Sequence, residues 1–263
     1  MAYLGGKASS ADHILEILND PLFDQFDYIE PFCGYCHILR RVINKKSYTA
    51  SDNNEYLMTL LKHIQKTKGK HETITRAEYK EIKEHPDKNK LRTAYAGFTY
   101  TYHGKFFGRY VNTYKGRNYP KERKRYYDKL HENPSFHEAK LQWTSYKKYS
   151  GVKGKLIYCD PPYVNTEAYH NPFDSSAFWD WVRRVSKENY VFVSEYEAPS
   201  DFICVSKKMK RQSMSGRGAT RKKQEKVFIH ESKLKDPIMK QILEGVPAKS
   251  QCKRKVTRKV TKN

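Results

Sequence analysis

Acidic residues are scarce in this sequence. Of its 263 residues, 29 are Asp or Glu and 51 are Lys or Arg, which gives a formal net charge of +22 at pH 7. Such an excess concerns partners rather than fold, and the natural partner of a polycation is a polyanion. Tyrosine is abundant, with 21 residues, so groups that stack on bases are mixed with the cations. The composition indicates a nucleic-acid partner, although a basic structural protein would give the same count.

Cysteine is also sparse, and long apolar runs are missing. The five cysteines include Cys33 and Cys36, but no second CxxC or His pair follows at the spacing of a zinc site. We therefore expect reduced thiols and no bound metal. No apolar stretch approaches the ~20 residues of a membrane-spanning helix, and Met1 is not followed by a signal-like apolar region. These absences predict an intracellular protein, in the cytoplasm or nucleus of a host cell, that is neither secreted nor inserted in a membrane.

The most informative stretch lies past the middle of the chain. Leu156 to Cys159 is a short apolar run that predicts a buried strand, and Asp160-Pro161-Pro162-Tyr163 follows it directly. Proline has no N–H, so two prolines in a row cannot continue a ladder and form a stiff corner at the carboxyl end of the strand. In open α/β sheets, ligands bind at that end.

This corner suits chemistry at an exocyclic amino group. The amino nitrogen of adenine is a poor nucleophile because its lone pair is delocalised into the ring. The Asp160 carboxylate and the Pro161 carbonyl can each accept one amino hydrogen, which would free the lone pair for attack. Pro162 stiffens the corner, and Tyr163 offers a flat face for an extruded base. An ordinary strand-ending turn is the plainer alternative.

The amino-terminal segment has features of a ligand loop. Two glycines precede Lys7, and a residue such as Gly6 lets the backbone approach a ligand closely while the ammonium meets an anion. Ser9 or Ser10 can then cap a helix. The apolar face of this predicted helix consists of Ile14, Leu15, Ile17 and Leu18.

Strand and helix signals alternate after this helix. Asp27 to Glu30 predicts a strand, with a turn at Gly34 and a helix over residues 38–43 behind it. A doubly wound fold places a nucleotide-like ligand on this first strand-to-helix turn.

A second predicted strand, Ser47 to Ser51, ends at Asp52. An acid at this point, 22 residues after Glu30, is placed to accept ribose hydroxyls, although it could also simply cap the next helix. That helix is predicted to begin after Asn54. Its apolar face consists of Leu57, Leu60, Leu61 and Ile64.

Residues 67–150 change in character, since Lys, Arg, Tyr and His dominate and clear periodicity fades. Such a mixture suits phosphate contact and insertion into a groove; a solvated basic face is the plainer alternative. The DNA-contacting candidates in this region are Lys105, Arg109, Tyr110, Arg117 and Arg123.

The ordered pattern returns after residue 150. A helix is predicted around Phe178 to Val185 and a buried strand at Tyr190 to Ser194. Residues 207–226 carry nine Lys or Arg and one acid, which predicts a mobile basic loop over DNA that contains the further candidate Arg217. Lys226 to His230 predicts a final strand. The tail after residue 248 has seven Lys or Arg and no acid, which predicts disorder.

Several of these stretches together resemble the Dam-like DNA adenine methyltransferases, in the alpha-type order of motifs, and more narrowly a phage or large-DNA-virus member. The resemblance covers about residues 3–230. The stretches that carry it, in the family's order, are Tyr3 to Lys7, Glu30 to Gly34, Asp52 to Asn54, His103 to Tyr110, Asp160 to Tyr163 and Val193 to Pro199. Short motifs in one fixed order are more specific together than any of them alone.

The resemblance implies an α/β fold, namely a Rossmann-like class I S-adenosylmethionine-dependent methyltransferase sheet of seven strands with an inserted DNA target-recognition region. The catalytic core would span residues 1–66 and 151–235, the insert 67–150, and a basic tail 249–263.

The resemblance also implies residue roles. Lys7 would lie near the methionine carboxylate of the donor, Asp52 would hold its ribose, and Phe32 and Gly34 would form the pocket wall. The implied donor-binding set is Tyr3, Gly6, Lys7, Glu30, Phe32, Gly34, Asp52, Asn53 and Asp160. The implied catalytic set is Asp160, Pro161, Pro162 and Tyr163. The sequence departs from the family at Cys36, where a second glycine is usual, and at Tyr3, where many relatives have tryptophan.

The implied function is site-specific transfer of a methyl group from S-adenosylmethionine to the N6 amino group of adenine in duplex DNA, by base flipping and without a metal. The partner would be duplex DNA with a short palindromic adenine site, bound by a monomer or homodimer, as in viral DNA methylation and restriction-modification. Methylation of the cytosine amino group or of a base in RNA stays open, and so does a DNA-binding or packaging protein with a vestigial pocket. Ring-carbon methylation of cytosine is unlikely because it needs a nucleophilic Cys next to Pro in a loop.

Overall fold

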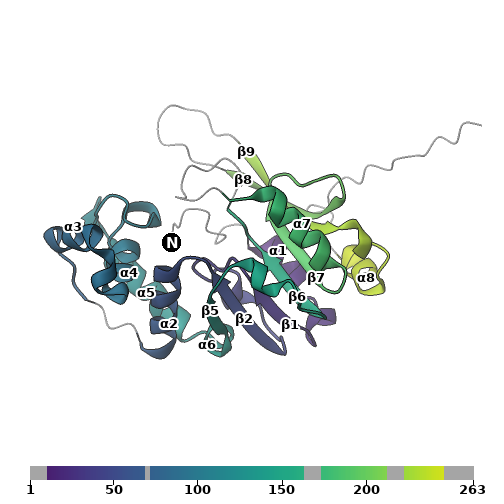
Figure 1. The fold of residues 1–263 in the computed structure, drawn as a ribbon, viewed down its shortest axis with the longest axis horizontal. Coiled ribbons are helices and arrows are strands. Elements are labelled where there is room, and N and C mark those ends of the chain that lie inside the picture. Colours follow the sequence, from purple (N-terminus) through teal and green to yellow (C-terminus); the bar gives the residue numbers. More distant parts are fainter. Residues whose placement is uncertain (1–10, 69–71, 163–172, 212–221, 246–263) are drawn as a thin grey trace, which may run out of the picture.

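Seven strands form one sheet through the middle of the molecule (Figure 1). The structure is a computed structural model, and it describes residues 11–68, 72–162, 173–211 and 222–245. The strands of this sheet are β1 (Asp27–Glu30), β2 (Ser47–Asp52), β5 (Lys140–Trp143), β6 (Lys155–Cys159), β7 (Tyr190–Glu195), β8 (Phe202–Arg211) and β9 (Lys222–His230).

The order of the strands indicates where a ligand would bind. The sheet runs β5-β2-β1-β6-β7-β9-β8, and the first five of these strands are parallel, whereas β9 is antiparallel to both β7 and β8. From β1 the chain first adds strands on one side, through β2 to β5, and then adds β6 on the other side. This reversal is the topological switch point of a doubly wound sheet, where ligands bind outside the carboxyl ends. The predicted α/β sheet of seven strands is confirmed.

Both faces of the sheet are covered. In β6, Leu156 and Tyr158 belong to one buried cluster, and Ile157 and Cys159 belong to another on the opposite face. A continuous apolar run is what a parallel strand with two covered faces requires. The helices that contribute to the first cluster are α1 (Asp12–Leu18), α2 (Glu55–Lys66), α4 (Lys90–Thr99), α5 (Tyr119–His131), α6 (Pro134–Glu138) and α8 (Pro237–Gly245). Helix α7 (Ser175–Ser186) packs in the second.

Helix α2 follows its sequence pattern. The Asn54 side chain accepts a hydrogen bond from the Leu57 N–H at 3.0 Å, so the predicted cap is present. All four predicted apolar positions of α2 are fully buried. Helix α1 also has the predicted apolar face, and its predicted serine cap lies outside the described residues. No helix among the described residues is long and apolar enough to cross a membrane.

The prediction of a helix over residues 38–43 is wrong. Only a 3-10 turn, η2 (Leu39–Arg41), forms there. The carbonyls that a longer helix would use are taken by side chains from distant segments. The Arg40 carbonyl accepts from Asn133, the Arg41 carbonyl from Asn19, and the Val42 carbonyl from Ser135, at 2.6–2.9 Å. The Ile43 N–H, which a helix to residue 43 would bond to the Leu39 carbonyl, donates instead to the Asn19 side chain at 3.1 Å, so tertiary hydrogen bonds end the turn.

Residues 67–150, the predicted insert, contain more regular secondary structure than their sequence indicated. It contains α3 (Arg76–Glu84), α4, α5, α6 and the small hairpin of β3 (Thr113–Tyr114) and β4 (Arg117–Asn118). Helices α3, α4 and α5 lie to one side of the sheet (Figure 1). Strand β5 falls inside the predicted range 67–150 but pairs with β2, so residues 140–143 belong to the sheet. The remaining 3-10 turns are η1 (Pro21–Phe23), η3 (Pro86–Lys88), η4 (Tyr102–Gly104), η5 (Tyr146–Tyr149) and η6 (Glu231–Lys233).

The described parts of the basic loop predicted over residues 207–226, namely 207–211 and 222–226, form a two-stranded ribbon. Strands β8 and β9 pair from Phe202↔His230 out to Arg211↔Lys222, with a bulge between Cys204 and Ser206. The ladder starts from buried residues such as Val227 and Phe228 and continues into the basic segment. Backbone pairing from this apolar base therefore overrides the loop character that the charge suggested. Arg217 and the tail 249–263 lie outside the described residues.

Candidate active site at the carboxyl edge of the sheet

Three acids from neighbouring strands meet at one edge of the sheet. Glu30 ends β1, Asp52 ends β2, and Asp160 follows β6. Because β1 pairs in parallel with both β2 and β6, with Ile29 opposite Thr49 and Ile157, the three carboxyl ends lie together. The structure therefore brings together three of the predicted site residues at the switch point.

Asp52 links the first two strand ends. Its carboxylate accepts hydrogen bonds from the N–H of Gly34 at 3.2 Å and from the N–H of Asn54 at 2.9 Å. Gly34 has φ of +46°, a conformation that glycine adopts readily. Burial raises the pKa of Asp52, and the backbone N–H groups act in the opposite direction. A carboxylate has about four acceptor positions, so acceptor capacity is left for ligand hydroxyls.

Glu30 is a buried acid beside this site. It is 2% exposed, and its carboxyl accepts a hydrogen bond from the Tyr28 hydroxyl at 2.7 Å. Burial raises the pKa of Glu30 to about 8, and the nearby Asp160 carboxylate adds to the effect. The carboxyl is therefore mostly protonated at pH 7, and a cationic ligand placed beside it would favour its ionised form.

The Asp160 corner keeps its predicted place. Pro161 is buried and Pro162 is partly buried. Burial first, and the Asp160 charge second, raise the pKa of both Tyr158 and Cys159. The Tyr158 hydroxyl lies 2.7 Å from the Ser194 hydroxyl, which ties β6 to β7 directly beneath the corner.

Aromatic side chains border the edge. The Phe32 ring stacks on Tyr146, with centroids 5.5 Å apart and planes 28° apart, and meets Phe178 edge-on. Asn53 is exposed, and its carbonyl accepts a hydrogen bond from the Trp143 indole N–H at 3.1 Å. Trp143 ends β5 and is 55% exposed. Sequence reasoning missed Trp143, although a tryptophan at the end of an edge strand in a basic region was a usable signal.

The DNA-contacting candidates differ in position. Lys105 and Arg109 are exposed, as a phosphate contact requires. Arg117 is exposed but forms a two-bond ion pair with Glu122, at 2.9 and 2.6 Å. Tyr110 serves packing within the insert, since its hydroxyl donates to the Ile74 carbonyl at 3.0 Å.

The prediction that Arg123 contacts DNA is wrong. It is 3% exposed, and its guanidinium carbon lies 5.8 Å from the centre of the Tyr35 ring, so it does not lie where a phosphate could reach it. Arg123 shares the buried face of α5 with Tyr126, Tyr127 and Leu130, which follow at helical spacing. The high charge of the segment concealed this periodicity in the sequence.

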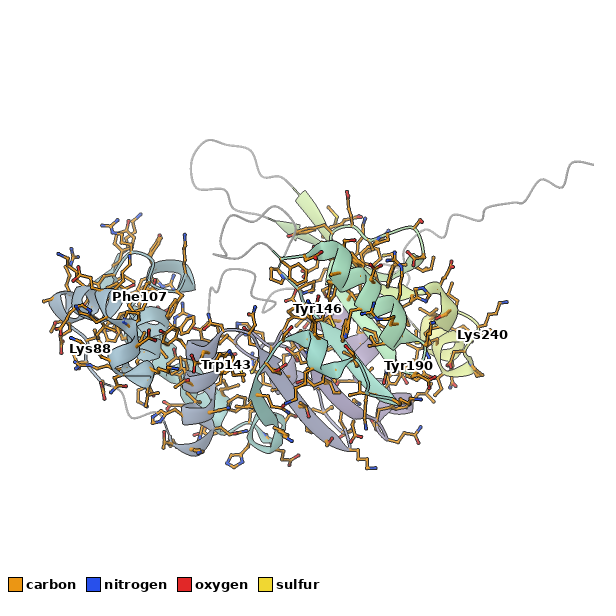
Figure 2. All side chains as sticks on the ribbon, in the orientation of Figure 1. Lys88, Phe107, Trp143, Tyr146, Tyr190 and Lys240 are labelled. Atoms are coloured by element: carbon orange, nitrogen blue, oxygen red, sulfur yellow. The ribbon has the colours of Figure 1, made fainter. Side chains whose placement is uncertain are left out.

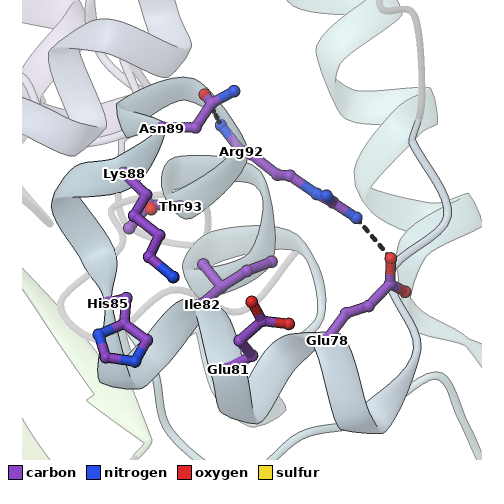
Figure 3. A pocket seen from close by; sticks show the side chains of 8 residues that line it. All are labelled: Glu78, Glu81, Ile82, His85, Lys88, Asn89, Arg92 and Thr93. Carbon is purple, nitrogen blue, oxygen red and sulfur yellow. Dashed lines mark hydrogen bonds and ion pairs between the residues drawn. The ribbon is translucent and has the colours of Figure 1, made fainter.

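A separate surface pocket lies between α3 and α4 (Figure 3). Arg92 extends across it to the Glu78 carboxylate, and Glu81, His85 and Lys88 line it as well. None of the predicted site residues lines this pocket, so we do not assign it to the reaction.

Five of the predicted site residues lie outside the described residues. They are Tyr3, Gly6, Lys7, Tyr163 and Arg217.

The backbone at Cys36 generates a first prediction. Cys36 is fully buried and has φ of +56°, so it keeps a glycine-like conformation although it has a β-carbon. We expect Cys36→Ala to unfold more easily than Cys36→Gly, by about 1 kcal/mol, because alanine retains the strain and loses the thiol packing. Urea unfolding of both variants measures the difference.

Cys159 is the matched control, since it is equally buried but lies in a regular strand. There the order should be the usual one, with Cys159→Ala more stable than Cys159→Gly. The same order at both positions would show that the backbone at Cys36 carries no strain.

The buried Glu30 generates a second prediction, on pH. The folded protein keeps the Glu30 proton up to about pH 8, whereas the unfolded chain releases it near its ordinary value of 4.5. The folded state thus binds more protons in this window, and its stability falls as the pH rises from about 4.5 to 8. We expect Glu30→Gln to gain stability relative to wild type across the window, by up to roughly 4 kcal/mol.

Urea unfolding at several pH values tests this expectation. Glu188→Gln, at an exposed acid, is the control and should follow wild type at every pH. Parallel curves of unfolding free energy against pH for wild type and Glu30→Gln would contradict the raised pKa of Glu30.

Comparison with known proteins finds a family match in the amino-terminal part of the chain. Residues 3–91 match the model of the family described as D12 class N6 adenine-specific DNA methyltransferase. This stretch includes Glu30, Gly34 and Asp52 and ends before the Asp160 corner. No curated protein matches the chain.

Solved structures give weaker likenesses. The rRNA methyltransferase aviRa from Streptomyces viridochromogenes is 11% identical, with a TM-score of 0.40 over 94% of this chain and 89% of that chain. The putative methyltransferase yhhF from Escherichia coli is 7% identical, with a TM-score of 0.36 over 88% and 92%. Scores this low support no inference, so only the family match to the segment that builds the first two strand ends carries weight. The amino-terminal third of the chain is thus similar to the D12 class of N6 adenine-specific DNA methyltransferases.

Proposed function

We propose that this adenine methyltransferase transfers the methyl group of S-adenosylmethionine to adenine N6 within a short, palindromic site of duplex DNA, and that it flips the base out of the helix to do so. The observation that carries the proposal is the meeting of Glu30, Asp52 and the Asp160-Pro161-Pro162 corner at the switch point of the sheet. The enzyme would act as a monomer or homodimer.

The residues at this edge fit the donor. When bound, S-adenosylmethionine supplies an electrophilic methyl group on a sulfonium. Asp52, fixed by two backbone N–H groups, would accept the ribose hydroxyls. The buried Glu30 carboxyl would lie near the positive charge of the donor, and Phe32 and Gly34 would form the wall. By resemblance, Tyr3, Gly6, Lys7 and Asn53 complete the site.

The corner prepares the amino group. The Asp160 carboxylate and the Pro161 carbonyl would each accept one hydrogen of the adenine amino group, so its lone pair points away from the ring plane. No strong base is needed before attack, because the amino group becomes acidic only once methylated. Most of the acceleration would come from positioning. Tyr163 would stack on the flipped base and offset part of the few kcal/mol that unstacking costs.

DNA contact is assigned to the insert. Residues 67–139, with β5 reassigned to the sheet, would form the target-recognition region, and the core would otherwise keep its predicted bounds. Lys105 and Arg109 are exposed and would contact phosphates, and Arg117 could exchange Glu122 for a phosphate.

Trp143 extends the proposed donor site toward β5. The strands run β5-β2-β1-β6, so a donor with its methyl group at Asp160 and its ribose at Asp52 directs its purine toward the end of β5. There lies the exposed Trp143 ring, labelled in Figure 2. It is oriented by its hydrogen bond to the Asn53 carbonyl. Stacking on this ring would hold the purine.

The Asp160 role gives the central prediction. Asp160→Asn keeps the shape of the side chain but replaces one acceptor oxygen by a donor amide and removes the charge. We expect methyl transfer to fall at least ~100-fold, since transition-state hydrogen bonds to such acceptors contribute several kcal/mol, while affinity for duplex DNA stays near wild type. The measurement is transfer of tritiated methyl from S-adenosylmethionine to unmethylated duplex DNA, with nucleoside analysis of the product.

Asp180→Asn is the matched control, because Asp180 is exposed on α7 and pairs with Arg183. It should leave transfer unchanged. Equal loss of transfer and DNA binding in Asp160→Asn would contradict its role, and label in methylcytosine would overturn the choice of base.

The Trp143 role gives a separate prediction. The other two tryptophans, Trp179 and Trp181, are buried, so a donor that stacks on Trp143 should change the intrinsic fluorescence mainly through that ring. We expect Trp143→Ala to abolish the change and to weaken donor binding by roughly 1–2 kcal/mol, about tenfold, as for loss of one stacking partner. Calorimetric titration with S-adenosylmethionine measures the affinity independently. Unchanged affinity in Trp143→Ala would remove this residue from the donor site.

A further inference from the structure

The β8–β9 ribbon places like charges directly opposite one another. In its ladder Lys207 pairs with Lys226. Like charges on directly opposite residues destabilise an antiparallel pair. Such a pair indicates that the two lysines serve something other than folding stability.

The ribbon extends past the edge of the sheet that carries the three acids. Strand β7 ends at Glu195, which is paired with Lys226. The pairs from Lys208↔Glu225 outward therefore continue beyond the end of β7 with no strand of the sheet beside β9. Because β7 is parallel to β6, this is the carboxyl edge, where Asp160 also lies. Figure 1 shows β8 and β9 rising above the sheet on that side.

The two faces of the ribbon differ in their ion pairs. Directly paired residues share a face. On the face toward α1, Lys208 forms an ion pair with Asp12 at 3.2 Å, which fastens the ribbon to the core. On the opposite face are Lys207 and Lys226. Lys226 also lies opposite Glu195 of β7, but within the described residues neither lysine forms an ion pair with a carboxylate.

An apolar side chain continues this second face. Met209, opposite Gln224, is two positions beyond Lys207 and is 53% exposed. A two-stranded ribbon has the width that the major groove of duplex DNA admits, and lysines on it that form no ion pair within the described residues suit phosphates. The insert lies beyond the other edge of the sheet, past β5, so DNA that presents a base to Asp160 would have a basic element on either side of the site.

We propose that the β8–β9 ribbon, through the face that carries Lys207, Lys226 and Met209, is a second DNA-binding element that holds the duplex against the active-site edge opposite the insert. The proposal rests on the proposed function for its choice of duplex DNA as partner. The ribbon binds the phosphate backbone, so it contributes affinity and positioning rather than choice of sequence.

A double substitution tests the proposed binding face. In the full chain, Lys207→Gln with Lys226→Gln should weaken binding of a fluorescein-labelled duplex of mixed sequence by at least about fivefold at low salt. The dependence of log affinity on log salt should become shallower by about 2, because each of the two lysines would neutralise one phosphate. Fluorescence anisotropy measures both, and calorimetry should show unchanged affinity for S-adenosylmethionine.

The matched control removes the same charge elsewhere. Lys187→Gln with Lys240→Gln changes exposed lysines at the end of α7 and on α8 (Figure 2 labels Lys240), and should keep the wild-type salt dependence. If both double variants have the same DNA affinity and salt dependence, the ribbon is not a DNA-binding element and the proposal is overturned.

A charge reversal separates binding from folding. Lys207→Glu converts the like-charge pair with Lys226 into an opposite-charge pair, so its urea midpoint should equal or exceed that of wild type while DNA affinity falls. A rise in stability with unchanged DNA affinity would overturn the proposal. Tighter binding of a single-stranded RNA of equal length, abolished in the same variants, would replace duplex DNA as the partner.

These outcomes are distinct from failure of the proposed function. That failure would appear as wild-type protein that binds duplex DNA but transfers no methyl group to any base. The ribbon proposal is decided by binding alone, whatever the result of the transfer assay.

Discussion

Parallel pairing of β1 with both β2 and β6 is the constraint on which the site depends. It brings to one edge three acids that are far apart in the sequence, and it does so with strands that are buried on both faces. The side chains on these faces, such as Tyr158 on one and Cys159 on the other, hold the strand ends in register. The corner at Asp160 depends on this register, because a slip by one residue would turn every side chain of β6 to the other face.

Burial at this edge destabilises the ionised forms of two of its acids. Burial raises the pKa of both Glu30 and Asp52, so their charged forms are less stable here than in water. Asp52 is compensated by the N–H groups of Gly34 and Asn54, whereas Glu30 keeps its proton near neutral pH. Such perturbed acids at a switch point are characteristic of functional sites, where local stability is traded for a prepared environment.

The basic charge of the chain is organised around the same edge. Some cations serve folding: Arg123 is buried on α5, and Lys208 fastens the ribbon to Asp12. Others, including Lys105 on the insert and Lys207 on the ribbon, have no such use in the described structure. The net charge of the sequence therefore combines structural cations with cations placed for a polyanion, and only their burial and partners tell them apart.

Local sequence determined the strands that end in acids, the capped helix α2 and the stiff corner at Asp160, because each depends on short-range patterns: apolar runs, helical spacing and the geometry of proline. Contacts between distant segments decided the rest. The Ile43 N–H and the carbonyls of residues 40–42 are bound by side chains from elsewhere, so the helix predicted there does not form. The glycine-like φ at Cys36, the position of Trp143 beside Asn53 and the extension of β8–β9 into a ribbon arise from neighbours in space. A pattern in one segment can specify its own periodicity, but it does not contain the partners that tertiary packing brings to it.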